Sequence, residues 1–438
     1  MKVKIVGAQA DTGRCLSGSY IVPGDKSISH RLVMLGGMAS GITEADGFLT
    51  GEDCLSTIRC FRALGVDIEL KGTRLTIQGT GRLSPPAETL DVGNSGTTLR
   101  LMTGLLAGQP FSTHITGDAS IQKRPMKRVT GPLSQMGAQI SGDRAPVTIE
   151  GRPLKGIQYT LPVASAQVKS AILLASLYAE GETVIEEPTP TRDHTEIMLS
   201  YLGATIVRDG NRIISRGPSP QLKARPISVP GDISSAAFLL AAAAIIPETV
   251  LTIQGVGVNP TRTGIIHVLR RMGADIRLHN KRSRCGEALA DIEIRHAPLK
   301  STTISGAEIP TLIDEIPAIA AVALFAEGET VISDAEELRV KETDRIKVVA
   351  EEFGKFFTGR KSPIATKEDG MVIKGGFPLA GAEVHSRGDH RLAMSLSVLA
   401  LAAQGESVIH DAGSADISFP GFYEMLPKSS RCYSSSKS

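Results

Sequence analysis

The chain of 438 residues has no tryptophan and only 6 tyrosines and 11 phenylalanines. So few aromatic side chains leave little surface on which nucleic-acid bases could stack. The 48 Lys and Arg residues nearly balance the 46 Asp and Glu residues, and the formal net charge of +2 gives no general reason to bind a polyanion. We therefore expect no nucleic-acid partner, and any basic residues that matter must act locally.

Long apolar runs are missing too, because one of the longest, residues 236–246, is about half as long as a bilayer requires. Residues 1–13 lack the apolar core of a secretory signal and the Arg/Ser-rich character of a transit peptide. The 5 cysteines include no C-x-x-C pair, which argues against a disulfide framework or a zinc site and favours a reducing compartment. We expect a cytoplasmic protein with no membrane partner.

What the chain does have is an internal repeat, with intervals of 66 to 81 residues. In each repeat a stretch of small apolar residues leads to Gly or Pro and then to Glu-Thr-Val-Ile or a related sequence. The repeats are marked by Gly41, Gly108, Gly181, Pro247, Gly328 and Gly405. The apolar stretch predicts a buried helix, the glycine its end, and the β-branched residues a strand. The sequence therefore predicts an α/β protein of six similar units.

A sequence segment that is repeated at a longer interval indicates how these units are grouped. The sequence V-P-G-D-K-S at 22–27 returns as V-P-G-D-I-S at 229–234, an offset of 207 residues. This offset equals about three units, so we expect two domains of three units each. Residues 21–229 would form one domain, and residues 1–20 with 230–438 the other, with the first strand, Lys2 to Val6, in the second domain.

Polar residues gather where the six apolar helices are expected to begin. A helix N-terminus offers about four unpaired N–H groups and a partial positive charge, and it binds anions well. Ser and Asp at these positions are also good N-caps whatever the function. Lys26, Arg31 and Arg391 are less easily explained, because a cation in a first turn costs about 0.3–1 kcal/mol unless an anion offsets it. The pattern predicts sites for small phosphorylated or carboxylated ligands that converge from both domains.

Each of two further charged clusters could be either a binding site or an ordinary charged surface. In residues 122–128, Pro125 fixes the turn before a helix, so Arg124 is either held for bidentate anion contact or part of a solvated basic face. Residues 339–345 alternate in sign and could simply form surface ion pairs. Because Asp314 belongs to the same part of the chain, we favour a site there.

Seven segments in order resemble the 5-enolpyruvylshikimate-3-phosphate synthase family of enolpyruvyl transferases. They are P-G-D-K-S-I-S-H-R (23–31), G-N-S-G-T-T-L-R (93–100), Q-K-R-P-M (122–126), A-S-A-Q-V-K-S (164–170), T-R-D-H-T-E (191–196), R-V-K-E-T-D-R (339–345) and D-H-R-L-A-M (389–394). The resemblance implies a two-domain inside-out α/β barrel of six βαβαββ units, three per domain. It also implies transfer of the enolpyruvyl group of phosphoenolpyruvate to the 5-hydroxyl of shikimate 3-phosphate, with release of phosphate, in aromatic amino acid biosynthesis. No metal and no organic cofactor are expected.

The same resemblance assigns residues to each ligand. Shikimate 3-phosphate would be bound by Lys26, Ser27, Arg31, Ser165, Ala166, Gln167, Arg192, Asp314 and Lys341. Phosphoenolpyruvate would be bound by Lys26, Gly96, Arg124, Gln167, Arg345 and Arg391. Catalysis needs one base and one acid of tuned pKa, and our hypothesis is Asp314 as base on the hydroxyl, Glu342 as proton donor to C3 and Lys26 as a proton shuttle.

Departures from the family pattern limit these assignments. Ile417 stands before Ser418-Phe419-Pro420 where some members have Lys, so no phosphate contact is expected there. Gly96 is Ala in one glyphosate-tolerant branch, and its retention predicts sensitivity to glyphosate. The serine-rich C-terminal tail is expected to be mobile. We also expect a monomer.

Three other functions fit the sequence less well. A UDP-N-acetylglucosamine enolpyruvyl transferase shares the fold, but it would have Lys-Asn where Lys26-Ser27 stands and a loop cysteine, whereas no Cys lies between residues 61 and 284. A P-loop kinase would need Gly where Asp25 precedes that pair. An inactive anion-binding protein would gain nothing from keeping the carboxylates of Asp314 and Glu342.

Overall fold

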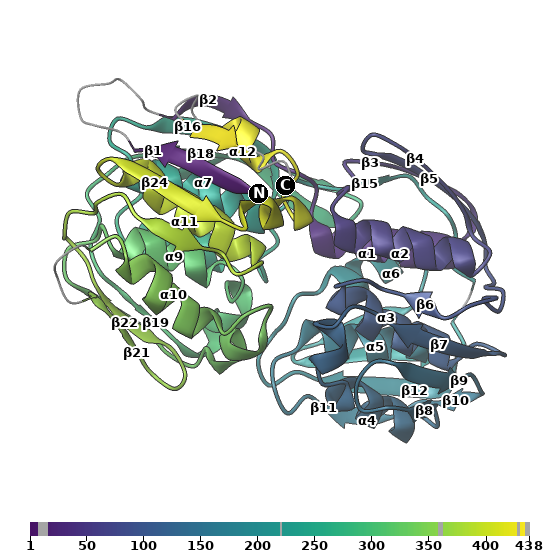
Figure 1. The fold of residues 1–438 in the computed structure, drawn as a ribbon. Helices are drawn as coiled ribbons and strands as arrows, with labels where there is room; N and C mark the ends of the chain where they lie inside the picture. The colour runs from purple at the N-terminus through teal and green to yellow at the C-terminus, as the bar shows by residue number, and fades with distance from the viewer. Residues whose placement is uncertain (8–15, 220, 358–361, 427–429, 434–438) are drawn as a thin grey trace. The chain divides into compact units, whose positions relative to one another are not determined.

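The computed structural model describes residues 1–7, 16–219, 221–357, 362–426 and 430–433 (Figure 1). The chain forms two compact units, each with its own apolar core. The inserted unit comprises Gly24–Pro230 and Ser283–Glu287, and the terminal unit comprises Met1–Pro23, Gly231–Arg282 and Ala288–Ser438. The end of the serine-rich tail, residues 434–438, lies outside the described residues.

Each unit contains three sheets built on one plan. A central strand pairs in parallel with one or, in one sheet, two short strands, and antiparallel with another strand. In the inserted unit the sheets are β15 (Ile227–Ser228), β3 (Ser40–Asp46), β5 (Arg74–Thr80), β4 (Asp67–Lys71); β6 (Leu90–Asp91), β7 (Ser112–Thr116), β9 (Val147–Glu150), β8 (Gln139–Ser141); and β10 (Leu154–Lys155), β11 (Gln158–Thr160), β12 (Ala179–Glu186), β14 (Arg212–Gly217), β13 (Ile206–Asp209).

The terminal unit repeats this plan with strands from both ends of the chain. Its sheets are β2 (Ser17–Tyr20), β16 (Val250–Gly257), β18 (Glu287–Arg295), β17 (Asp275–Arg284); β19 (Thr303–Ile304), β20 (Glu329–Ile332), β22 (Met371–Lys374), β21 (Ile364–Thr366); and β23 (Glu383–His385), β24 (Glu406–His410), β1 (Lys2–Val6), β25 (Ser430–Tyr433). The first strand, β1, lies beside β24 near the other end of the chain (purple and yellow in Figure 1), with Lys2 opposite His410.

Two helices accompany each sheet. In the inserted unit they are α1 (Lys26–Met38), α2 (Glu52–Ala63), α3 (Gly96–Ala107), α4 (Lys127–Gln135), α5 (Ala166–Ser176) and α6 (His194–Tyr201). In the terminal unit they are α7 (Ile233–Ile245), α8 (Gly264–Arg271), α9 (Ile316–Ala323), α10 (Arg345–Gly354), α11 (His390–Ala402) and α12 (Phe422–Met425). The short 3₁₀ turns are η1 (Ile121–Lys123), η2 (Gly306–Thr311), η3 (Glu336–Val340) and η4 (Ala412–Ile417).

The small-residue helices form the centre of each unit. All residues of α7 are buried, and α7, α9 and α11 pack against one another. In the inserted unit a Cβ at Gly104 of α3 would lie 2.1 Å from the carbonyl oxygen of Ala171 on α5, so only glycine permits this approach. Small residues are required because the helices pack closely, which explains the apolar stretch of each repeat.

The prediction that glycine ends each apolar helix is wrong for most repeats. The C-caps of α1 and α11 are Ala39 and Ala403. Gly41 and Gly405 follow, at φ of 108° and 91°, where strands β3 and β24 begin. The glycine is needed for this left-handed backbone conformation, since other residues would be strained there.

None of the described helices is both long and apolar enough to span a membrane.

Candidate anion-binding and catalytic sites

The apolar helices begin with polar caps, as the sequence predicts. The side chains of Asp25, Ser95 and Ser165 accept hydrogen bonds from backbone amides in the first turns of α1, α3 and α5. Asp232 and Asp389 do the same for α7 and α11. Helix α9 differs, because Glu315 at its N-cap makes no such bond and its carboxylate is used elsewhere.

Helix α1 carries two cations in its first turns. Lys26 Nζ lies 3.1 Å from Asp53 Oδ2, and both side chains are largely buried. Arg31 is 4% exposed and donates from Nη1 to the carbonyl oxygen of the half-buried Ser27 at 2.9 Å. Burial lowers the pKa of Arg31 to about 10, and the positive charge of Arg192 acts in the same direction, while the carboxylates of Glu196 and others oppose it. Arg31 and Arg192 therefore form a pair of like charges close enough to repel.

A chain of hydroxyl groups links the starts of α1 and α3. His30 Nδ1 lies 2.7 Å from Thr57 Oγ1, which is 2.7 Å from Thr98 Oγ1, and that atom is 2.6 Å from Ser95 Oγ. His30 is fully buried. Burial, together with the charges of Lys26 and Arg31, lowers the pKa of His30 well below its ordinary value. The imidazole is therefore neutral at physiological pH.

The starts of α3 and α5 are also bonded to each other. Gln167 donates from Nε2 to Thr97 Oγ1 at 3.1 Å and accepts from Arg100 Nη1 at 2.6 Å. Arg124 donates from Nη2 to Asn94 Oδ1 at 3.0 Å, just before α3. A Cβ at Gly96 would lie 3.0 Å from Nη1 of Arg124.

In the inserted unit, the predicted residues therefore lie at the N-terminal ends of helices that are hydrogen-bonded to one another. They are Lys26, Ser27 and Arg31 on α1; Gly96 on α3; Arg124 beside it; Ser165, Ala166 and Gln167 on α5; and Arg192 before α6. Lys and Arg side chains and helix N-termini together suit phosphate and carboxylate groups.

In the terminal unit, Arg345 is surrounded by carboxylates. It is 1% exposed and donates from Nε to Asp389 Oδ2 at 2.8 Å, from Nη2 to Glu342 Oε2 at 2.7 Å and from Nη1 to Asp314 Oδ1 at 3.4 Å. Burial alone would lower the pKa of Arg345, but these carboxylates outweigh it and raise the pKa above its ordinary value. For Asp389, burial tends to raise the pKa of the carboxyl group. The positive charge of Arg345 is the main reason that the pKa of Asp389 is lowered instead.

Asp314 and Glu342, the predicted base and acid, share Arg345 as a partner. Lys341 Nζ also lies 3.4 Å from Asp314 Oδ1. The side chains of Asp314, Lys341 and Glu342 are 16%, 28% and 27% exposed, so all three reach solvent. Carboxyl groups are common general acids and bases, so this pair is a candidate for proton transfer.

Arg391 is buried in the first turn of α11. Its Nη1 lies 3.4 Å from the carbonyl oxygen of Ser234 and 3.7 Å from Glu315 Oε1, which also accepts a hydrogen bond from the Ser234 hydroxyl. Asp389 caps α11 through the Arg391 amide at 2.9 Å and also binds Arg345. The five predicted residues of the terminal unit, Asp314, Lys341, Glu342, Arg345 and Arg391, are therefore linked.

Sequence reasoning missed several residues of these clusters. Asp389 and Arg100 lie in segments that resemble the family but had no predicted contact, and Glu315 was not predicted at all. Arg100 follows Gly96 by four residues on α3, a spacing that puts both on one helix face and offered a signal. No local pattern pairs Asp389 with Arg345, because the two are distant in sequence.

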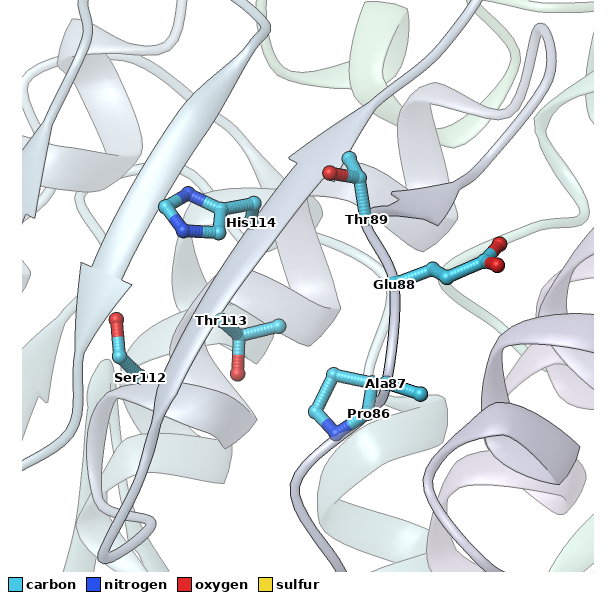
Figure 2. Close-up of a pocket in the computed structure, with 7 residues that line it drawn as sticks. All are labelled: Pro86, Ala87, Glu88, Thr89, Ser112, Thr113 and His114. Carbon is cyan, nitrogen blue, oxygen red and sulfur yellow. The ribbon is translucent and has the colours of Figure 1, made fainter.

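Two cavities in the inserted unit lie away from these residues. One, of about 530 Å³, is lined by Pro86, Ala87, Glu88, Thr89, Ser112, Thr113 and His114, along β7 and the segment before β6 (Figure 2). The other, of about 620 Å³, lies where α1, α3 and α5 end and includes Met38, Gly108 and Tyr178. None of the predicted site residues lines either cavity. Within the described part of the chain, no group of three or more His, Cys, Asp or Glu residues is arranged to hold a metal ion.

Comparison with known proteins identifies the family. The family model for EPSP synthase (3-phosphoshikimate 1-carboxyvinyltransferase) matches residues 10–426. A 3-phosphoshikimate 1-carboxyvinyltransferase of Thermoanaerobacter sp. (strain X514) is 54% identical over 94% of this chain and 97% of that protein. The Brevibacillus brevis protein of the same name is 52% identical over 95% and 98%. The solved structure of EPSP synthase from Acinetobacter baumannii matches with a TM-score of 0.85 and 46% identity over 97% of both chains.

These matches define the protein as a transferase. The chain belongs to the EPSP synthase (3-phosphoshikimate 1-carboxyvinyltransferase) family. The predicted fold class, a two-domain inside-out α/β fold, is confirmed by this structural match.

Proposed function

We propose that this chain transfers the enolpyruvyl group of phosphoenolpyruvate to the 5-hydroxyl of shikimate 3-phosphate and releases phosphate, a step of aromatic amino acid biosynthesis. The observation that carries the proposal is Arg345, a buried guanidinium shared by the two carboxyl groups that the reaction needs, Asp314 and Glu342. The family membership of nearly the whole chain supports the same reaction.

The proposed substrate contacts follow from charge. Both substrates carry a carboxylate and a phosphate, and their repulsion must be offset by Lys and Arg. Shikimate 3-phosphate is assigned to Lys26, Ser27, Arg31, Ser165, Ala166, Gln167, Arg192, Asp314 and Lys341. Phosphoenolpyruvate is assigned to Lys26, Gly96, Arg124, Gln167, Arg345 and Arg391.

For the chemistry, Asp314 takes the proton of the 5-hydroxyl as its oxygen attacks C2 of phosphoenolpyruvate. Glu342 donates a proton to C3, so that a tetrahedral intermediate forms. Loss of a proton from C3 and departure of phosphate then give the enolpyruvyl ether. Lys26, whose Nζ lies 3.1 Å from Asp53 Oδ2, shuttles protons in this proposal.

The assignment of Glu342 is tested by Glu342→Gln, which cannot donate the proton. We expect kcat to fall by about 10²–10⁴. Exchange of the methylene hydrogens of phosphoenolpyruvate with deuterated water, followed by NMR, should stop. Glu336→Gln is the control, because Glu336 is an exposed carboxylate of the neighbouring turn η3. Undiminished exchange in Glu342→Gln would assign the acid role to another group.

The function itself is tested by phosphate release. We expect release when phosphoenolpyruvate and shikimate 3-phosphate are both present, and none with either alone. Release with UDP-N-acetylglucosamine in place of shikimate 3-phosphate would instead favour the related transferase. Binding of both ligands without release would favour an inactive anion-binding protein.

We further propose that the enzyme is a cytoplasmic monomer. Among the cysteines that the structure describes, Cys60 and Cys285 are free thiols, which agrees with a reducing compartment. Light scattering of the purified protein tests the monomer, and a mass of two chains would refute it.

A further inference from the structure

The inserted unit contains a lysine that the proposed mechanism does not use. Lys169 of α5 is 0% exposed, and its Nζ lies 2.8 Å from Glu187 Oε1 and 2.7 Å from Glu196 Oε1. Lysine and glutamate are almost never buried completely unless they are paired, and burying such charges is costly. Such a cluster contributes little to the stability of the folded protein, because apolar side chains in its place would often be as stable. The cluster therefore suggests a positioning role.

One part of the cluster fixes the backbone just before Arg192. Glu187 Oε1 accepts hydrogen bonds from the Thr191 amide at 3.1 Å and from the Thr191 hydroxyl at 2.5 Å. Lys169 Nζ lies 3.3 Å from the carbonyl oxygen of the same residue. Thr191 is thus held through its amide, its carbonyl and its side chain.

The other part fixes the chain just after Arg192. Ser170, the neighbour of Lys169, has its Oγ 2.7 Å from Thr195 Oγ1, and Arg31 donates to both hydroxyls at 2.7 Å. Thr195 directly precedes Glu196, the second carboxylate on Lys169. Helix α5 therefore holds both ends of the segment 191–196 and bonds Arg31 at the same time.

Burial is the main reason that the pKa of Arg31 is lowered, and the positive charge of Arg192 adds to it. Lys169 Nζ offsets part of the charge of Glu187 and Glu196, and Arg208 Nη2, 3.4 Å from Glu187 Oε2, offsets more of it. Without Lys169, these carboxylates would attract Arg31 and Arg192 more strongly and compete with an external anion.

We propose that Lys169, Glu187 and Glu196 form a positioning network that holds Arg192 beside Arg31 and so sets the preference for a substrate with a 3-phosphate. The proposal rests on the proposed function, in which the two arginines contact that phosphate. None of the three network residues touches a reacting atom in this account.

The test compares two ligands that differ only by the phosphate. The binding of shikimate 3-phosphate and of shikimate to the full-length protein is measured by calorimetry, for the wild type and for Lys169→Met. We expect Lys169→Met to weaken the binding of shikimate 3-phosphate by about tenfold or more, and that of shikimate by less than about twofold. The KM for phosphoenolpyruvate should stay near the wild-type value, and Lys169→Arg should restore part of the phosphate preference.

Two further variants separate positioning from loss of stability. Leu174→Ala removes a buried side chain of the same helix that lies outside the network, and should keep the phosphate preference. Glu196→Gln should lose the preference even if Lys169→Met fails to fold. Preference retained in a folded network variant, or lost equally in Leu174→Ala, would overturn the proposal. A wild-type protein that binds both ligands equally would instead refute the proposed function.

Discussion

Gly96 shows how a single missing methyl group shapes a site. It opens α3 and is buried, and a Cβ there would lie 3.0 Å from Arg124 Nη1 and 3.1 Å from Arg100 Nη1. These distances are tighter than ordinary contacts, but both neighbours are the ends of flexible side chains. A methyl group would therefore move the guanidinium groups rather than unfold the helix.

We predict that Gly96→Ala raises the KM for phosphoenolpyruvate by about tenfold, equivalent to about 1.4 kcal/mol, because Arg124 is displaced from its partner Asn94. The wild type should be inhibited by glyphosate at low phosphoenolpyruvate, and the variant much less, in steady-state assays of phosphate release. Gly131→Ala is the control, since nothing lies within 4 Å of a Cβ there. Wild-type turnover that persists in millimolar glyphosate would contradict the prediction of sensitivity.

Helix α1 illustrates how an element supports charged groups at its start. Asp25 caps it through the Ile28 amide at 2.9 Å, and Lys26 and Arg31 lie in its first turns. His30, between them, is buried and kept neutral by burial and by these two cations. A protonated imidazole would add a third positive charge inside the same two turns.

This arrangement predicts a pH dependence of stability. The pKa of His30 is lowered in the folded state, so the unfolded chain binds a proton that the folded chain does not. Stability is therefore present above the unfolded pKa of about 6.5 and falls below it, by at most about 1.4 kcal/mol per pH unit. In urea unfolding between pH 7 and 5, His30→Asn should lose less stability than the wild type. His114→Asn, which changes an exposed histidine 2.9 Å from Thr148 Oγ1, should follow the wild type. Parallel curves for all three proteins would refute the prediction.

The elements themselves could be predicted well because their causes are local. The stretches of small residues predicted the buried helices. The repeated segments around Asp25 and Asp232 predicted two helix N-termini that the structure shows to be capped. Partners across the fold could not be predicted. Lys169 in the run A-Q-V-K-S is typical of an exposed helix position, and its burial depends on carboxylates from the segment 187–196. The three carboxylates around Arg345 come from residues 314, 342 and 389, and only tertiary packing brings them together.

At the scale of the whole molecule, the chain passes between two units with separate cores. The apolar cluster of the inserted unit runs from Ile28 to Val229 and shares no residue with that of the terminal unit. The parallel neighbour of β3 is β15, which lies near the C-terminal end of the stretch Gly24–Pro230. The first sheet of the inserted unit is therefore completed by a strand of the same stretch. Apart from the short segment Ser283–Glu287, this unit is therefore one continuous stretch, Gly24–Pro230.

We predict that residues 24–230, produced alone, fold and bind shikimate 3-phosphate but catalyse nothing. The stretch contains its own core and the proposed phosphate contacts Arg31 and Arg192, whereas Asp314 and Glu342 belong to the terminal unit. Circular dichroism in urea should show one cooperative transition, and calorimetry should show binding weaker than that of the full chain, because Lys341 and Asp314 are missing. Arg192→Ala in the same fragment should abolish the binding without changing the transition. Unfolding of the fragment without cooperativity would show that the inserted unit depends on the rest of the chain. A folded fragment that does not bind shikimate 3-phosphate would refute the assignment of its phosphate to Arg31 and Arg192.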